Sequence, residues 1–197
     1  MGMHELSSHR EDAVLVARAQ AGDQAAFRQL FEAYSPLVYR IAYRMLGEAE
    51  EAADLTQDIF VRAYQRLASL RDGQAFHAWI TRMAVNYSHD RLRRRRPTPL
   101  SLDAPPPGTG DGTTWEIPAV HADVEASLLA SELTAQVENA LRRLSPEHRA
   151  VVVLHHLEAL PVDEIAGLLD LPTGTVKSRL SRARAELKRA LAGYFEA

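Results

Sequence analysis

Residues 162–191 read VDEIAGLLDLPTGTVKSRLSRARAELKRAL, and this stretch predicts two helices joined by a tight turn. The first helix has an apolar stripe at helical spacing, formed by Val162, Ile165, Leu168 and Leu169. Residues 170–172, Asp-Leu-Pro, end that helix, because the residue before a proline is disfavoured in the α region. We therefore expect a second helix to begin near Thr173.

The second helix has one apolar face and one basic face. Its apolar residues recur at steps of three and four, at Val176, Leu180, Ala183, Leu187 and Leu191. The basic face and its flanks carry Lys177, Ser178, Arg179, Ser181, Arg182, Arg184, Lys188 and Arg189. Such a face is either merely solvated or lies in the major groove of DNA. We favour DNA binding, because the tight turn suits a helix-turn-helix and small residues among the arginines permit close approach.

The composition is that of a globular protein without disulfides. The chain has 197 residues, of which 46% are hydrophobic and 25% charged, and its net charge is -3. It contains no cysteine, which excludes a disulfide framework and favours a reducing, cytoplasmic compartment. No run approaches the 18 or so apolar residues that span a bilayer, so we expect no membrane insertion.

Residues 12–96 predict a helical domain. One helix is expected to end at Gly22, Asp23 can cap the next, and Ser35-Pro36 is typical of a further helix start. A helix over 48–70 has a core face, formed by Ala52, Leu55, Ile59, Ala63 and Leu67. Its other face is a polar ridge that contains Asp54, Gln57, Asp58 and Arg62. Periodicity alone favours a solvated surface for this ridge.

Residues 76–96, FHAWITRMAVNYSHDRLRRRR, interleave aromatic and basic side chains and end in four arginines. We assign Phe76, Ile80 and Met83 to the core, and periodicity leaves Trp79 and Tyr87 undecided. Rings beside cations suit single-stranded nucleic acid, since bases stack on the rings while arginines hold phosphates. Aromatic residues at this spacing are equally typical of an ordinary core.

Residues 97–123 predict a linker. They are rich in proline, glycine and threonine, contain no Lys or Arg, and offer Trp115 as one candidate anchor. A second helical domain follows over 124–197, in which Ser145-Pro146 begins a helix by cap and proline and 151–157 forms a buried run. The sequence thus predicts an all-α fold of two small domains.

No motif predicts an enzyme, a cofactor or a metal site. The adjacent histidines His155 and His156 point about 100° apart on a helix, and no HExxH motif or carboxylate cluster accompanies them. The chain also lacks a glycine-rich phosphate loop and a GxSxG nucleophile elbow. A structural role for the histidines is favoured over metal binding.

Taken together, the two ends resemble the extracytoplasmic-function (ECF) type of bacterial RNA polymerase sigma factor. DLTQDIFVRAYQRL at 54–67 and the aromatic-basic segment at 76–96 resemble region 2, and residues 144–191 resemble region 4. This resemblance covers nearly the whole chain. It implies a region 2 domain at 1–96, a linker at 97–123 and a region 4 domain at 124–197.

The resemblance also implies a role for each surface. The ridge residues Asp54, Gln57, Asp58 and Arg62 would bind the β′ clamp of core polymerase. The −10 element would be read and melted by Trp79, Arg82, Asn86, His89, Arg93 and Arg94. The −35 element would be read by Thr175, Lys177, Ser178, Arg179, Ser181, Arg182, Arg184, Lys188 and Arg189. Ser181 is smaller than the residue that some members carry there, which puts a base contact at this position in doubt.

The implied partners are core RNA polymerase, through its β′ clamp and β flap, promoter DNA and an anti-sigma factor. Two alternatives are a stand-alone helix-turn-helix regulator and an enzyme with a helical histidine site. Binding to core polymerase separates the sigma factor from the regulator, and metal analysis separates it from the enzyme.

Overall fold

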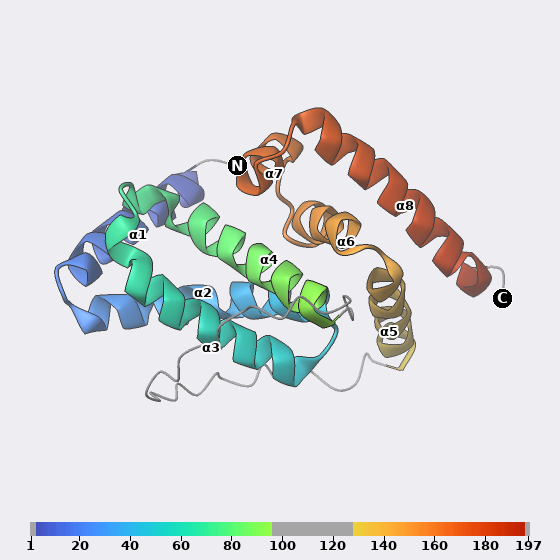
Figure 1. Cartoon of the computed structure of the whole chain (residues 1–197), viewed down its shortest axis with the longest axis horizontal. Coiled ribbons are helices and arrows are strands. Elements are labelled where there is room, and N and C mark those ends of the chain that lie inside the picture. The colour runs from blue at the N-terminus through green and yellow to red at the C-terminus, as the bar shows by residue number, and fades with distance from the viewer. Residues whose placement is uncertain (1–2, 96–127, 196–197) are drawn as a thin grey trace, which may run out of the picture.

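In the computed structural model, residues 3–95 and 128–195 are described, and every regular element within them is a helix (Figure 1). The N-terminal domain contains α1 (Met3–Gln20), α2 (Gln24–Leu46), α3 (Ala49–Arg66), the short 3-10 helices η1 (Leu67–Ser69) and η2 (Gly73–Ala75), and α4 (Phe76–Arg95). The C-terminal domain contains α5 (Leu128–Arg143), α6 (Pro146–Val152), the π-helical turn η3 (Val153–Leu157), α7 (Val162–Leu169) and α8 (Thr173–Phe195). The predicted all-α, two-domain fold is confirmed. The predicted linker and Trp115 lie outside the described residues.

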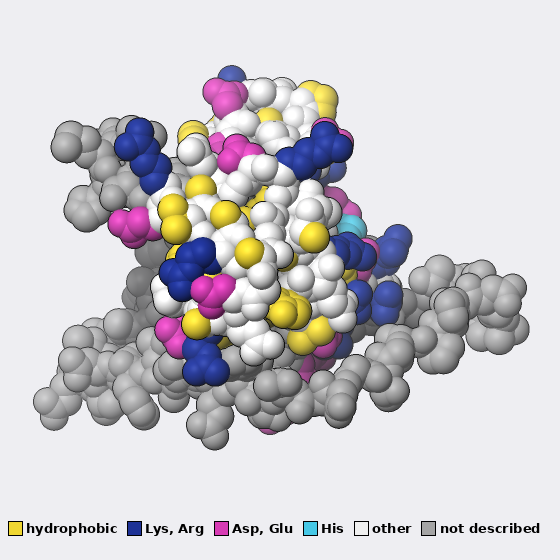
Figure 2. All heavy atoms as spheres, turned by 90° about the vertical axis from the view of Figure 1, so that its left-hand side faces the viewer, with side chains coloured by type: hydrophobic (Ala, Val, Ile, Leu, Met, Phe, Trp, Pro, Cys, Tyr) yellow, Lys and Arg dark blue, Asp and Glu magenta, His cyan; other side chains and the backbone are white. Residues whose placement is uncertain are grey.

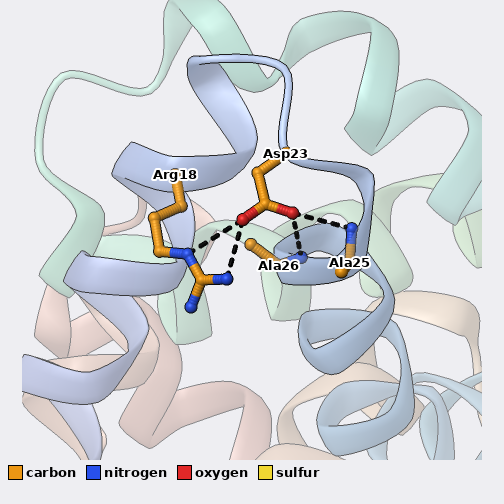
Figure 3. A network of polar contacts seen from close by, with 4 residues as sticks. All are labelled: Arg18, Asp23, Ala25 and Ala26. Carbon is orange, nitrogen blue, oxygen red and sulfur yellow. Dashed lines mark hydrogen bonds and ion pairs between the residues drawn. The ribbon is translucent and has the colours of Figure 1, made fainter.

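The junction between α1 and α2 is set by one carboxylate. Asp23 caps α2, and its side chain accepts hydrogen bonds from the backbone N–H groups of Ala25 and Ala26 at 3.0 and 3.2 Å. The other carboxylate oxygen accepts two bonds from the Arg18 guanidinium at the end of α1 (Figure 3). These contacts lower the pKa of Asp23, with the Arg18 hydrogen bond as the largest cause. The predicted cap is therefore confirmed.

The predicted helix start at Ser35-Pro36 was wrong. Helix α2 runs without interruption through Pro36 and ends at Leu46, with Gly47 as its C-cap. A proline inside a helix removes one backbone hydrogen bond and usually costs about 3 kcal/mol. Here Tyr34 and Val38, on either side of the proline, are both buried, and Pro36 itself is exposed. Tertiary packing of the flanking residues therefore outweighs the local helix-start signal.

The N-terminal core forms where α2, α3 and α4 pack together. Leu30 and Ile41 of α2, Ile59 of α3, and Phe76 and Ile80 of α4 are fully buried. The predicted core face of the helix over 48–70 is confirmed, although this helix ends at Arg66 and continues as the 3-10 turn η1. Met83 is buried as predicted, and the undecided Trp79 and Tyr87 are half-buried against the core.

The C-terminal domain is built around the predicted helix-turn-helix. Helix α7 ends at Leu169, and Asp170 adopts the left-handed conformation with φ 55° before Pro172. Three residues of the predicted α8 stripe, Val176, Leu180 and Ala183, are buried against the rest of the domain. Ser145 caps α6 by accepting from the His148 N–H, also as predicted. Of the predicted buried run over 151–157, the part from 151 to 154 is buried and the histidines lie nearer the surface.

The two domains pack against each other. Helix α4 lies beside α6 and α7, and α2 contacts α5, α6 and η3 (Figure 1). Buried apolar residues of both domains belong to one contiguous cluster. Within the described ranges, no helix is both long and apolar enough to cross a membrane.

Candidate nucleic-acid and partner interface

The polar ridge lies on the outer side of α3. Asp54 and Asp58 are exposed, whereas Gln57 and Arg62 are half-buried. Helix α3 is amphipathic: Leu55, Ile59 and Ala63 face the core, and the ridge residues lie on the opposite side of the helix. The ridge thus offers carboxylate and amide groups for hydrogen bonds to a partner.

Arg62 is oriented by a contact from the neighbouring helix. Its guanidinium lies over the ring of Tyr87 in α4, 5.0 Å from the ring centroid. Cations at this position above an aromatic ring are attracted by about 0.5–1 kcal/mol at exposed sites. This contact connects the ridge on α3 with the aromatic-basic segment on α4.

An exposed apolar pair extends the ridge, and sequence reasoning did not single it out. Val61 and Tyr64 are 53% and 48% exposed on α3, and the Tyr64 ring packs edge-on against Phe27 of α2 at 4.9 Å. Exposed large apolar side chains beside polar groups are typical of protein interfaces. Val61 and Tyr64 follow Asp58 at steps of three residues, and this helical spacing could have indicated that they lie beside the ridge.

On the α1 end of the molecule, Figure 2 shows hydrophobic, acidic and basic side chains interspersed without one dominant charge.

The predicted −10 residues of α4 are exposed or half-buried, and two of them, Arg82 and His89, also contact the other domain. Asn86 is exposed, and Trp79 is half-buried beside Phe76 at a ring separation of 5.9 Å. The Arg82 guanidinium donates to the backbone carbonyl of Gly167 in α7. His89 Nε2 lies 3.2 Å from Glu147 Oε1 in α6.

The end of α4 carries the exposed arginines. Arg93 and Arg94 are both exposed, and Arg93 forms an ion pair with Asp90 one turn earlier at 3.3 Å. Exposed pairs of this kind contribute little to stability, so Arg93 can exchange its partner for a phosphate at small cost. Five of the predicted −10 residues therefore lie on one face of α4, because they recur at steps of three and four, at Trp79, Arg82, Asn86, His89 and Arg93.

The predicted −35 residues lie along α8, opposite its buried stripe. Six of them are exposed at Lys177, Ser178, Ser181, Arg182, Lys188 and Arg189, and a seventh, Arg184, is exposed nearer the flank. Thr175 and Arg179 are half-buried. The Ser178 hydroxyl donates to the Thr175 carbonyl at 2.9 Å, which fixes its orientation at the start of the helix. The N-terminal half of α8 thus presents an open, basic and narrow face.

Arg184 has a partner within the domain. Its Nε donates to His156 Nε2 at 3.2 Å. Burial lowers the pKa of His156, and the positive charges of Arg184 and His155 lower it further. His155 Nδ1 lies 2.9 Å from the Leu160 carbonyl, so both histidines have structural partners. Within the described residues, no three His, Asp or Glu side chains gather as a metal site.

Two family models match this chain in the order that the two domains follow. The model described as Sigma-70 region 2 matches residues 30–98, and the model described as Sigma-70, region 4 matches residues 134–187. The first match contains α3 and α4, and the second contains α7 and most of α8.

Curated relatives and a solved structure extend the match over nearly the full length. The chain is 34% identical to the ECF RNA polymerase sigma factor SigW of Bacillus subtilis over 177 residues, or 89% of this chain and 94% of SigW. It is also 34% identical to the ECF RNA polymerase sigma-E factor of Escherichia coli, covering 91% of this chain and 93% of that one. The solved structure of CnrH in complex with the cytosolic domain of CnrY is similar with a TM-score of 0.66, at 27% identity and covering 93% and 98% of the two chains. This chain therefore belongs to the ECF sigma factors of the sigma-70 family.

Proposed function

We propose that this ECF sigma factor divides its work among the three helices described above. As a sigma factor it binds core RNA polymerase and directs promoter-specific transcription initiation. We assign core binding to α3, −10 recognition and melting to α4, and −35 recognition to α8. The observation that supports this division best is that one chain carries the polar ridge, the aromatic-basic helix and the basic recognition helix in the order of regions 2 and 4.

The ridge residues Asp54, Gln57, Asp58 and Arg62 are assigned to the β′ clamp. A mixed set of carboxylate, amide and guanidinium groups suits a hydrogen-bonding protein interface. The exposed Val61 and Tyr64 add apolar area next to the ridge, and we include them in the same interface. The β flap is assigned to the C-terminal domain.

Base reading is assigned to the N-terminal half of α8 and melting to α4. Residues near the start of a recognition helix meet base edges, while those further along meet phosphates. Lys177, Ser178, Ser181 and Arg182 are exposed in the half that would enter the groove. On α4, the half-buried Trp79 and the exposed Asn86 provide a ring and an amide, the two groups that hold an unstacked base.

A protein regulator of the anti-sigma type is part of this proposal. The related CnrH was solved with the cytosolic domain of CnrY bound. We infer a similar class of partner for this chain, and action in the cytoplasm, where core polymerase transcribes.

Run-off transcription with purified core polymerase on genomic fragments tests the function directly. We expect discrete transcripts that depend on adding this protein. Core polymerase without sigma factor, and core with the region 4 fragment alone, serve as controls and should give none. Promoter-specific binding by the free chain without any gain in transcription would favour a stand-alone regulator instead.

A further inference from the structure

Arg184 of the recognition helix α8 is held by a histidine from another element. The Arg184 Nε donates to His156 Nε2 at 3.2 Å, and His156 lies in the π-helical turn η3. A ring nitrogen that accepts a hydrogen bond carries no proton, so this contact exists only while the His156 ring is neutral. The position of an arginine on α8 therefore depends on the charge of a ring outside that helix.

Arg184 lies on one long edge of the exposed face of α8. It follows Lys177 by seven residues and precedes Lys188 by four, so the three cations lie on the same side of the helix. All three are exposed. A line of cations along the edge of a recognition helix suits the phosphates that border a groove, whereas the base edges lie inside the groove. Arg184 is therefore placed for a phosphate contact.

The bond to His156 limits how Arg184 can bind a phosphate. A guanidinium binds an oxyanion best through two parallel N–H bonds, and one of the geometries that allow this uses Nε together with a terminal nitrogen. While Nε donates to the ring, that geometry is blocked. Protonation of His156 removes the acceptor and places two positive charges side by side, so the Arg184 side chain is repelled from the ring. Its Nε then becomes available to a phosphate.

Protonation of His156 and DNA binding should favour each other. The pKa of His156 lies below the ordinary 6.5, because partial burial disfavours the charged ring and the positive charges of Arg184 and His155 disfavour it further. A phosphate beside the ring would offset these charges and raise the pKa. Because such coupling is reciprocal, a protonated ring must in turn strengthen binding of the phosphate.

The other charged groups around η3 leave Arg184 as the partner of His156. His155, the neighbour in the same turn, has its Nδ1 2.9 Å from the Leu160 carbonyl. Three charged groups on the other elements that contact η3 have partners of their own, in the pairs Arg40 with Glu158, His148 with Glu186, and Asp163 with Thr173. Among the described residues, Arg184 and His155 are the two whose charges act on the pKa of His156.

We propose that His156 is a positioning residue for DNA binding by α8: its neutral ring holds Arg184 back from the phosphates, and its protonated ring releases Arg184 to them. This inference rests on the proposed function, because it concerns the −35 helix assigned above. It gives that helix a pH dependence. The affinity for DNA should rise as the pH falls from 7.5 to 5.5, the range in which a histidine of slightly lowered pKa takes up its proton.

Two histidine variants separate this contact from a general effect of acid. His156→Gln keeps a neutral acceptor that cannot be protonated, so Arg184 should stay held at both pH values. His155→Gln makes the same change at the next residue, whose ring contacts the Leu160 carbonyl, and it should keep the pH dependence of the parent. Arg184→Ala removes the arginine itself. Because Arg184 is exposed, this variant should fold even if a histidine variant does not.

Fluorescence anisotropy measures binding of the full-length chain to a labelled DNA duplex of random sequence, at pH 7.5 and pH 5.5 and over a series of salt concentrations. A random sequence is sufficient, because phosphate contacts do not depend on the bases. Between pH 7.5 and pH 5.5, the affinity of the parent and of His155→Gln should rise about threefold more than that of His156→Gln or Arg184→Ala. Their slope of log affinity against log salt should also steepen by roughly one unit, as one additional phosphate contact implies.

Nuclear magnetic resonance of the full-length chain tests the contact itself. In the parent, the Arg184 Nε–Hε signal should shift with pH at the same midpoint as the His156 ring, and this midpoint should lie below pH 6.5 and rise when the duplex is added. In His156→Gln the signal should not titrate.

Three results would overturn the proposal: an Arg184 signal that does not change with pH, no binding of the parent to the duplex at pH 5.5, or an equal gain in affinity for the parent and His156→Gln. Neither measurement uses polymerase or a promoter. A chain that shows the expected titration and duplex binding but gives no run-off transcripts would therefore contradict the proposed function and leave the role of His156 in place.

Discussion

At the scale of single residues, Arg182 and Lys188 should make different kinds of DNA contact. Both are exposed on α8, but Arg182 lies in the N-terminal half and Lys188 almost two turns further along. Arg182→Ala should cost about 1–3 kcal/mol on the cognate −35 element and relax base preference at one position. Binding to a randomised −35 library measures both effects. An unchanged base preference would remove Arg182 from the set of base-reading residues.

Lys188→Ala should instead weaken binding to all sequences about equally. Losing one phosphate contact and its released counterion should reduce the slope of log affinity against log salt by roughly one unit. Titrations at several salt concentrations on the same library provide this slope. A sequence-dependent loss would move Lys188 to the base-reading residues.

Glu147 should make stability depend on acid pH. The hydrogen bond from its own backbone N–H, at the start of α6, lowers its pKa to about 2, with help from His89 and Ser145. Since this folded pKa lies below the usual 4.5, the contribution to stability is complete above pH 4.5 and is lost as pH falls toward 2. Between pH 5 and pH 3, the Tm measured by thermal melting should decrease less for Glu147→Gln than for the parent.

Solvent exposure of the Glu147 side chain limits how much it contributes to the free energy of unfolding. An exposed carboxylate pair contributes at most about 1 kcal/mol after solvent screening. Glu32→Gln, on the exposed part of α2, is the charge-matched control and should retain the parent's pH dependence. If Glu147→Gln and the parent lose stability equally between pH 5 and pH 3, the assigned cause is wrong.

The burial of residues in a repeating apolar pattern could be predicted from the sequence, whereas the burial of a single arginine, Arg149, could not. Val176, Leu180 and Ala183 are buried as their spacing predicts, because a helix turns every 3.6 residues. Arg149 looks like any arginine of a short surface helix. Its partner at Met45 lies 104 residues away in sequence, and no local pattern encodes that contact.

At the scale of elements, α3 should bind core polymerase through its ridge. Changing Asp54, Gln57 and Asp58 together to alanine should weaken competition for core polymerase at least tenfold, since several interface hydrogen bonds are lost at once. Helix content should stay the same, because none of the three is buried. Glu32→Ala on α2 is a control of similar exposure. A triple variant that competes as well as the parent would show that the ridge is not the interface.

Helix boundaries could be predicted where caps and breaking residues agree with packing. Asp23 and Ser145 cap helices as their residue types predict, and Asp170-Leu171-Pro172 ends α7. The helix start predicted at Ser35-Pro36 was wrong, because the packed residues on either side of Pro36 keep α2 continuous. The exposed Val61 and Tyr64 were overlooked because the ridge was identified by polarity alone.

At the scale of the whole molecule, the order of the two domains could be predicted and their docking could not. Order follows from the sequence motifs, which lie in separate stretches of the chain. Docking includes bonds from Arg142 to the Gly47 carbonyl after α2 and from Arg82 to the Gly167 carbonyl in α7. Every helix end has such carbonyls, so they leave no signature in the sequence. Gly47 illustrates the point. Its position as a helix C-cap is predictable, but its closeness to Arg142 is not.

Cleavage between the domains should show whether their packing contacts hold them together without a covalent connection. Residues 97–123 have a composition that proteases accept, so limited proteolysis should produce two fragments, and the C-terminal fragment should retain −35 affinity. If the bonds of Arg142 and Arg149 to the end of α2 help to hold the domains together, the fragments of the parent and of Gly22→Ala, whose added Cβ meets nothing within 4 Å, should co-elute in size-exclusion chromatography. The fragments of Gly47→Ala should dissociate about fivefold more readily, because its added Cβ displaces Arg142 and removes one of several hydrogen bonds between the domains. Immediate separation of the parent fragments at the same concentration would mean that these contacts hold the domains together only when the chain is intact.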